Sequence, residues 1–247
     1  AARFAGAFSP AYADTLGPER ALDDIDRIDR LSDEAPVASD FYADDESDRA
    51  AARVAIYRFE SAIPLSQRVP LLENMGFTVI DERTYTIKPR YDGGVRNVFL
   101  HDMALKTFDA RPIDPARAGA ALEDAVLAVF SGRAENDAFN RLVLAADCDW
   151  REAAMLRAYA GYMRQIRLPY GARYIADTLV THAARTRDLV RLFKLRLDPG
   201  SPADQDERNR REVEARAAFE TALAEVSSLD EDSILRALLG LVSATVR

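Results

Sequence analysis

The sequence predicts an α+β protein, in which a small sheet domain of the degenerate ferredoxin-like type is followed by an all-helical domain. Two observations carry this prediction. Between residues 52 and 132, strand-like and helical apolar patterns follow one another in the order β-α-β-β-α. From residue 133 onward every apolar pattern has helical spacing. We therefore expect an N-terminal helix with an acidic linker at 1–48, the sheet domain at 49–132 and the helical domain at 133–247.

The first forty residues contain one predicted helix. Gly17-Pro18-Glu19 places a proline at the first helical position and an acid in the first turn, where the helix dipole favours both. The aliphatic side of this helix consists of Leu22, Ile25, Ile28 and Leu31. The acids between them, Asp24 included, are expected to face water. The acidic stretch that follows, up to residue 48, has the composition of a solvated linker.

The sheet domain begins with a predicted strand at 53–59. Its residues are β-branched, aromatic and almost continuously apolar, which is typical of a strand covered on both faces. A short helix follows, with Ser66 as its expected N-cap and Gly76 as its left-handed end. Alternating apolar and polar residues then predict a long strand at 77–89 with one face in water.

A turn at Asp92-Gly93-Gly94 leads into a predicted returning strand at 98–105. Asp114-Pro115 starts a second helix, which ends at Gly132. These are five of the six elements of a ferredoxin-like unit. The fourth strand is either absent or supplied by an early segment such as 38–42. A sheet of three strands would leave an open edge, which predicts contact with another domain or subunit.

Start and stop signals divide the helical domain. Asp149 and Glu152 form a capping box at the start of one helix, which ends at Pro169. The next helices are predicted at about 174–179, 189–197, 206–226 and 230–246, with a stop at 198–200 and a charged linker at 201–211. The last helix is strongly amphipathic.

Composition narrows the function classes. The 247 residues include 41 acidic and 33 basic side chains, with a net charge of −8 and a sequence pI of about 5.0. Nucleic-acid binding needs a basic surface that releases counterions from phosphates, and we expect none. The apolar stretches are shorter than the roughly 20 residues of a membrane helix. A single cysteine, Cys148, excludes an intramolecular disulfide, so a reducing cytoplasm is the expected compartment.

Residues suited to catalysis are few. His101 is expected to be hydrogen-bonded and partly buried on a strand, and His182 to lie at a helix C-terminus. Cys148 lies between Asp147 and Asp149, which raise a thiol pKa, so we interpret it as structural. Neither a nucleophile elbow nor a glycine-rich phosphate loop occurs in the sequence. The prediction is that this chain holds no catalytic residue, metal site or cofactor.

One block is more specified than its neighbours. Acids and amides gather in front of an apolar helical run, and the block comprises Glu135, Asn136, Asp137, Asn140 and Arg141. The simplest interpretation is an elaborate helix start that bonds to the preceding turn. An effector site and an interdomain joint are the alternatives.

This block also carries a family resemblance. GRAENDAFNRLVLAADCDWREAAMLRAYAGYMRQ, residues 132–165, closely resembles the segment before the catalytic domain of large bacterial NAD-specific glutamate dehydrogenases. YADTLGPERALDDIDRID, PLLENMGFTVIDERTYTI, the LHDMAL strand and SLDEDSILRALLGLVSATVR resemble the same family in the same order. The resemblance covers nearly the whole chain, and residues 135–144 are its most specific part.

The resemblance implies an ACT-like module at 52–132 and a role in allosteric control and homo-oligomer assembly. It places catalysis, the oxidative deamination of L-glutamate to 2-oxoglutarate with NAD+, in a separate domain of the same polypeptide. ACT modules usually bind amino acids near the first strand-to-helix loop, often at a glycine. Here that loop is 59–64, which lacks glycine, and Glu60 and Ser61 are its candidate residues for an amino-acid effector.

Three functions follow from these observations. The first is a non-catalytic regulatory and architectural segment of such an enzyme, which acts beside its catalytic domain within a homo-oligomer. The alternatives are an amino-acid-binding sensor of the ACT type and a segment that serves only oligomerisation. The missing initiator methionine and the uncapped last helix lead us to expect a fragment of a longer polypeptide.

Overall fold

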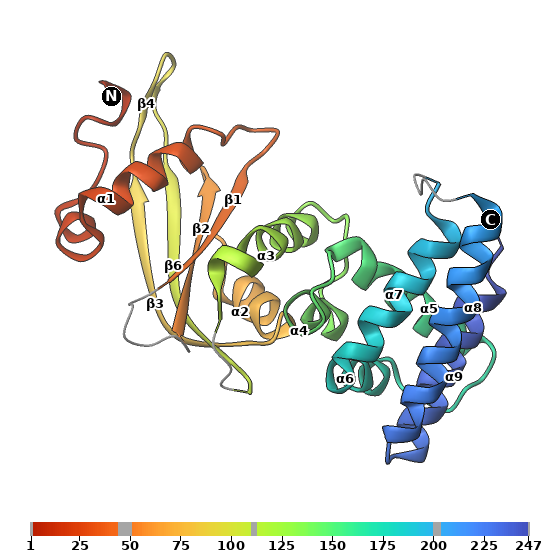
Figure 1. Ribbon diagram of the computed structural model, residues 1–247. Coiled ribbons are helices and arrows are strands. Elements are labelled where there is room, and N and C mark those ends of the chain that lie inside the picture. The colour runs from red at the N-terminus through yellow and green to blue at the C-terminus, as the bar shows by residue number, and fades with distance from the viewer. Residues whose placement is uncertain (1, 44–50, 110–112, 200–203, 247) are drawn as a thin grey trace. The chain divides into compact units, whose positions relative to one another are not determined.

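The protein is described by a computed structural model that covers residues 2–43, 51–109, 113–199 and 204–246. The chain divides into two compact units, residues 1–136 and 137–247, and each unit has its own hydrophobic core (Figure 1). The first unit contains the sheet and the second is helical. The predicted α+β class is therefore confirmed, and each unit is described by itself below.

The first unit is built on a four-stranded antiparallel sheet in the order β1-β2-β6-β3. Its strands are β1 (Val37–Ala43), β2 (Ala51–Phe59), β3 (Phe77–Ile87) and β6 (Val98–Thr107). Two short strands, β4 (Arg90–Tyr91) and β5 (Gly94–Val95), form a hairpin around the predicted turn. Strand β3 carries a bulge between Val79 and Asp81.

Strand β1 supplies the fourth strand of the sheet. It pairs with β2 in register, with Phe41 opposite Val54. The alternative that 38–42 completes the sheet is therefore confirmed, and the prediction that this stretch is an acidic linker is wrong for 37–43. Residues 44–48 of the expected linker lie outside the described residues. Alternating Val37, Ser39 and Phe41 can form a strand here because β2 offers its whole edge as a partner.

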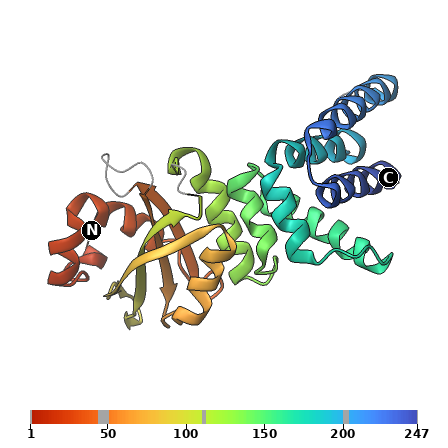
Figure 2. The same ribbon diagram turned by 90° about the horizontal axis from the view of Figure 1, so that it is seen from below.

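Helices cover both faces of this sheet. Helix α1 (Pro10–Ile28) follows the short η1 turn (Ala2–Phe4) and packs on one face, whereas α2 (Leu65–Asn74) and α3 (Pro115–Phe130) lie on the other (Figure 2). Helix α2 begins after Pro64, so Ser66 is not its N-cap as predicted. Gly76 ends the turn after α2 with a φ of 96°, as predicted.

Helix α1 departs from the prediction in two ways. It starts at Pro10, capped by Ser9, and Gly17 interrupts it with a φ of 71°. The expected start at Gly17-Pro18 is thus a kink inside a longer helix. The expected orientation is also wrong, because Leu22 is 66% exposed whereas Asp24 is completely buried. Asp24 turns inward because two tyrosine hydroxyls and an arginine meet its carboxylate there.

The second unit consists of helices throughout its described residues. They are η2 (Ala138–Arg141), α4 (Leu142–Ala145), α5 (Trp150–Gln165), α6 (Ala172–Thr181), α7 (Ala183–Leu197), α8 (Gln205–Ala222), η3 (Leu223–Glu225) and α9 (Leu229–Ala244). The capping box of Asp149 and Glu152 is confirmed at the start of α5. Helix α8 begins at Gln205, so the predicted linker at 201–211 is wrong from that residue on. No helix among the residues described here is long and apolar enough to cross a membrane.

Candidate functional sites

A buried carboxylate lies between α1 and the sheet. Asp24 accepts hydrogen bonds of 2.6 Å from the hydroxyls of both Tyr12 and Tyr57, and Arg20 approaches its Oδ1 to 2.8 Å. Burial raises the pKa of Asp24, whereas Arg20 and the two tyrosines oppose that shift. Arg20 also binds Asp40 of β1 at 2.6 Å. These contacts join α1 to two strands through charged and polar groups.

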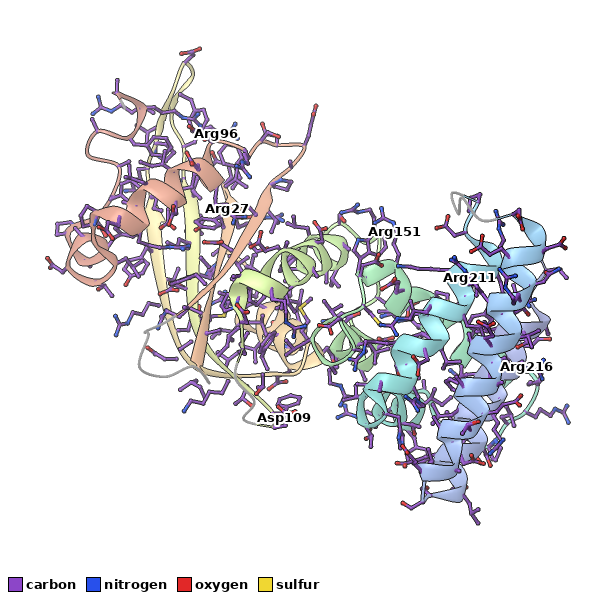
Figure 3. The ribbon with its side chains drawn as sticks, viewed as in Figure 1. Arg27, Arg96, Asp109, Arg151, Arg211 and Arg216 are labelled. Carbon is purple, nitrogen blue, oxygen red and sulfur yellow. The ribbon has the colours of Figure 1, made fainter. Side chains whose placement is uncertain are left out.

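The outer edge of β1 is covered by side chains. Alternate residues of an edge strand direct their backbone groups outward, where they can pair with another strand. Arg27 of α1 donates to the Ser39 carbonyl at 3.0 Å, and Glu123 of α3 accepts from the Phe41 N–H at 3.3 Å. Arg27 and Glu123 also form an ion pair of 2.6 Å (Figure 3). The open edge expected beside a missing fourth strand is therefore closed at β1.

A polar cavity of about 440 Å³ lies along α1 and β1. It is lined by Arg20, Asp23, Asp26, Arg27, Arg30, Asp40 and Tyr42. Arg20 and Arg27 both bind Asp40, and Arg20 stacks over the ring of Tyr42 at 3.9 Å. The charges on its inner wall are thus engaged within the protein, which indicates a structural rather than a catalytic use.

The predicted effector loop at 59–64 is held by its own chain. Glu60 has a left-handed φ of 64°, donates its N–H to Asn97 at 2.8 Å and pairs through its carboxylate with Arg96. Ser61 is exposed, and its N–H donates to Phe59. The Ile63 N–H donates to Nε2 of His101 at 3.1 Å. Three loop amides that could cradle a carboxylate are therefore engaged in intramolecular bonds.

His101 is a buried structural histidine, 1% exposed, as its strand position predicted. Its Nε2 accepts from Ile63, so Nδ1 carries the proton and faces Thr84 Oγ1 at 3.0 Å. Thr84 in turn donates to Glu82, which pairs with Arg68. Burial, reinforced by the charge of Arg68, lowers the His101 pKa to about 4. The imidazole is therefore neutral at physiological pH.

The other two groups considered in the sequence are also structural. His182 lies between α6 and α7, as expected for a helix end, and its Nε2 is 2.9 Å from Glu231 of α9. Cys148 is buried, and burial together with Glu152, Asp149 and Asp147 raises its thiol pKa to about 12. Within the described parts of the chain, no three His, Cys, Asp or Glu side chains are placed to hold a metal ion.

The polar block at 135–141 splits into separate interactions. Asp137 caps η2 through the Phe139 N–H at 3.0 Å, and Arg157 of α5 bonds to both Asp137 (2.7 Å) and the buried Asn140 (2.8 Å). Arg141 instead pairs with Asp177 of α6 at 2.6 Å. These bonds support the helix-start interpretation for the part of the block in the second unit.

The rest of the block belongs to the first unit. Asn136 accepts from Asn74 of α2 at 3.0 Å, and Glu135 is exposed. The structure therefore does not gather the five candidate residues into one site. The residue that organises Asp137 and Asn140 is Arg157, which the sequence analysis missed. Twenty residues separate Arg157 from Asp137, so no local spacing signals the pair.

We expect Arg157→Ala to destabilise the second unit by about 2 kcal/mol, because it leaves the buried Asn140 oxygen without its charged donor. Trp150, the only tryptophan, lies at the start of α5 and reports this unit's unfolding in urea by its fluorescence. Arg173→Ala is the matched control, since Arg173 is 74% exposed, and we expect a change within about 0.5 kcal/mol. Equal losses in the two variants would refute the role given to Arg157.

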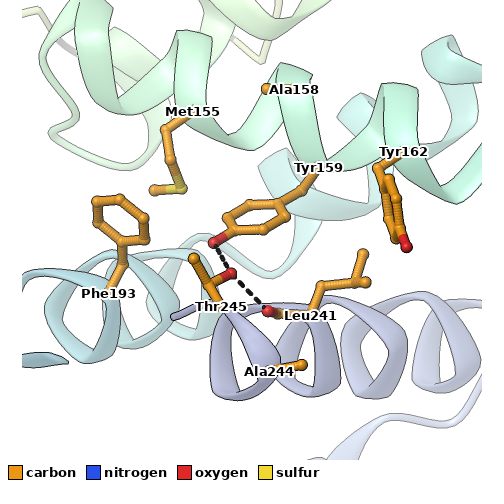
Figure 4. A pocket seen from close by; sticks show the side chains of 8 residues that line it. All are labelled: Met155, Ala158, Tyr159, Tyr162, Phe193, Leu241, Ala244 and Thr245. Carbon is orange, nitrogen blue, oxygen red and sulfur yellow. Dashed lines mark hydrogen bonds between the residues drawn. The ribbon is translucent and has the colours of Figure 1, made fainter. Parts of the chain in front are cut away.

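An apolar groove of about 420 Å³ opens between α5 and α9, and the sequence analysis did not predict it. It is lined by Met155, Ala158, Tyr159, Tyr162, Phe193, Leu241, Ala244 and Thr245, and we name it the α5–α9 groove (Figure 4). The hydroxyl of Tyr159 bonds to Thr245 Oγ1 at 2.7 Å, and Thr245 donates to the Leu241 carbonyl at 2.8 Å. The groove thus presents mainly carbon atoms.

Three family models match the chain in succession. They describe helical motif 2 of glutamate dehydrogenase at residues 1–31, its ACT3 domain at 36–118 and its helical motif 3 at 134–199. The ACT3 match begins at β1, which agrees with the place of that strand in the sheet.

Curated relatives match over the full length of the chain. The NAD-specific glutamate dehydrogenase of Halomonas elongata is 37% identical over 246 residues, which are 99% of this chain. Those of Pseudomonas aeruginosa and Mycobacterium tuberculosis are each 36% identical over all of it. The chain spans 15% of the length of each relative. It belongs to the NAD-specific glutamate dehydrogenase family, within which it corresponds to helical motif 2, the ACT3 domain and helical motif 3.

Proposed function

We propose that this chain is a non-catalytic regulatory and architectural segment of a large NAD-dependent glutamate dehydrogenase. The parent enzyme would oxidise L-glutamate to 2-oxoglutarate and ammonia with NAD+, in a catalytic domain of the same polypeptide. The observation that carries the proposal is the match to NAD-specific glutamate dehydrogenases over the whole chain, which spans only 15% of their length.

The chemistry of the described residues supports an architectural role. His101 is neutral and buried, Cys148 has a raised pKa, and the Asp24 carboxylate is engaged by three side chains. Each of these groups stabilises the fold and is withdrawn from solvent, whereas a catalytic acid, base or nucleophile must reach a substrate. We further propose that the parent enzyme is a cytoplasmic homo-oligomer.

The test compares the purified 247-residue chain with the full-length enzyme at equal molar concentration. We expect NADH formation from glutamate and NAD+ by the full-length enzyme and none by the chain, because binding and chemistry would require the other domain. The measurement is absorbance at the NADH band, with circular dichroism as the check that the chain is folded. Glutamate-dependent NAD+ reduction by the chain itself would overturn the proposal.

An amino-acid sensor is the second candidate, with Glu60 and Ser61 in its expected loop. The engaged amides of Glu60, Ser61 and Ile63 speak against binding there. Titration calorimetry of the chain against all twenty amino acids decides between the two functions. A heat of binding that Glu60→Gln abolishes would favour the sensor.

A further inference from the structure

The α5–α9 groove is suited to an apolar occupant. Its two central hydroxyls, on Tyr159 and Thr245, already bond to each other, and Thr245 also bonds to Leu241. A charged or polar ligand that entered would lose its hydration without gaining hydrogen-bond partners from these groups. An aliphatic or aromatic side chain would instead remove apolar surface from water at both contacting faces. The chemistry of the lining therefore selects a hydrophobic segment of protein.

The spacing of apolar residues on α5 indicates that this segment is a helix. Met155, Tyr159, Tyr162 and Ile166 follow at intervals of four, three and four residues, which is the pattern of a helix that packs lengthwise against another helix. Tyr162 and Ile166 are 49% and 50% exposed, so the outer half of this row faces solvent. Small side chains at Ala158 and Ala244 leave room for a helix backbone to approach closely.

We propose that the α5–α9 groove receives the apolar face of a helix from the part of the same enzyme that lies outside residues 1–247. This inference rests on the function proposed above. The chain spans 15% of each relative, so most of the parent polypeptide lies outside it. A helix in the same polypeptide also meets the groove at high effective concentration. A second copy of this chain is the competing occupant, but a two-fold contact needs a self-complementary surface, and this one is concave.

The test places a photo-crosslinking benzoylphenylalanine at Tyr162 of the full-length enzyme. We expect irradiation to join position 162 to a peptide of the same polypeptide outside residues 1–247, identified by mass spectrometry. The matched control carries the crosslinker at Val213 of α8, which is 69% exposed in the same unit but does not line the groove. A crosslink from position 162 to residues 1–247 of a second copy, or to a different protein, would overturn the proposal. So would a yield no higher than that at Val213.

A charge substitution provides the second readout. Tyr162→Asp should lower the Tm of the full-length enzyme by roughly 2–4 °C, the size expected for a loss of about 1 kcal/mol in a large domain. In the 247-residue chain the same substitution should leave the Tm unchanged, because Tyr162 is half exposed there. Val213→Asp should have no effect in either protein. An equal fall in both proteins would contradict the proposal, and neither experiment depends on the NADH assay that tests the function.

Discussion

Asp24→Ala is expected to destabilise the first unit by about 3–5 kcal/mol, the range for removing one partner of a buried ion pair. The substitution leaves the Arg20 guanidinium buried without its closest carboxylate, and it deprives the hydroxyls of Tyr12 and Tyr57 of their acceptor. We expect α1 to detach from the sheet before the strands separate, because all three contacts of Asp24 join α1 to itself or to β2. Hydrogen exchange of the amides in α1 and β2 measures this loss.

Hydrogen exchange is the appropriate probe because Trp150 lies in the second unit and its fluorescence does not report this one. The matched control is Asp23→Ala, which removes an exposed carboxylate from the neighbouring position of the same helix. We expect that variant to stay within about 0.5 kcal/mol of the natural protein. If Asp23→Ala and Asp24→Ala accelerated exchange equally, the structural role assigned to the buried carboxylate would be wrong.

Acidification is expected to weaken the first unit by about 3 kcal/mol between pH 6.5 and pH 4 through His101 alone. The folded-state pKa of about 4 lies below the ordinary value of 6.5, so the unfolded chain binds the proton first as pH falls. Stability from this group is therefore complete above pH 6.5, declines as pH falls and is fully lost below pH 4. The physical cause is that a protonated ring can no longer accept the Ile63 N–H and must be charged while buried.

His101→Gln isolates this contribution from the carboxylates that also titrate in acid. Its side-chain oxygen can still accept from Ile63, but it does not take up a proton in this range. Urea unfolding followed by circular dichroism at pH 7 and pH 4 should show a smaller decrease for the variant, by about 3 kcal/mol. Parallel decreases in the two proteins would mean that His101 does not set the acid sensitivity of the unit.

Local patterns were sufficient for much of the fold. Strand β2 is apolar on both faces and lies between helices, as its composition predicted. Gly76 and the capping box of Asp149 and Glu152 mark helix ends at their predicted places, because each acts on backbone groups within a few residues. The family resemblance quoted from these segments is confirmed by matches over the whole chain.

The candidate sites were less predictable, because their partners are distant in sequence. Asp24 appeared to be one more solvated acid in an acidic helix, and only the position of Tyr57, 33 residues away, explains its burial. Arg157 is similarly defined by Asp137 and Asn140. The effector loop was expected to be available, yet His101, 38 residues after Ile63, binds one of its amides.

By itself the sequence determined the α+β class, the order of the main strands and helices, and the family, since these depend on local periodicity and on similarity along the chain. Only the tertiary structure decided that β1 completes the sheet, that Arg27 and Glu123 close its edge, and that α5 and α9 enclose an apolar groove. The physical reason is that burial and hydrogen bonding depend on which elements meet, and residues such as Arg27 and Glu123, 96 positions apart, acquire their roles only when the chain brings them together.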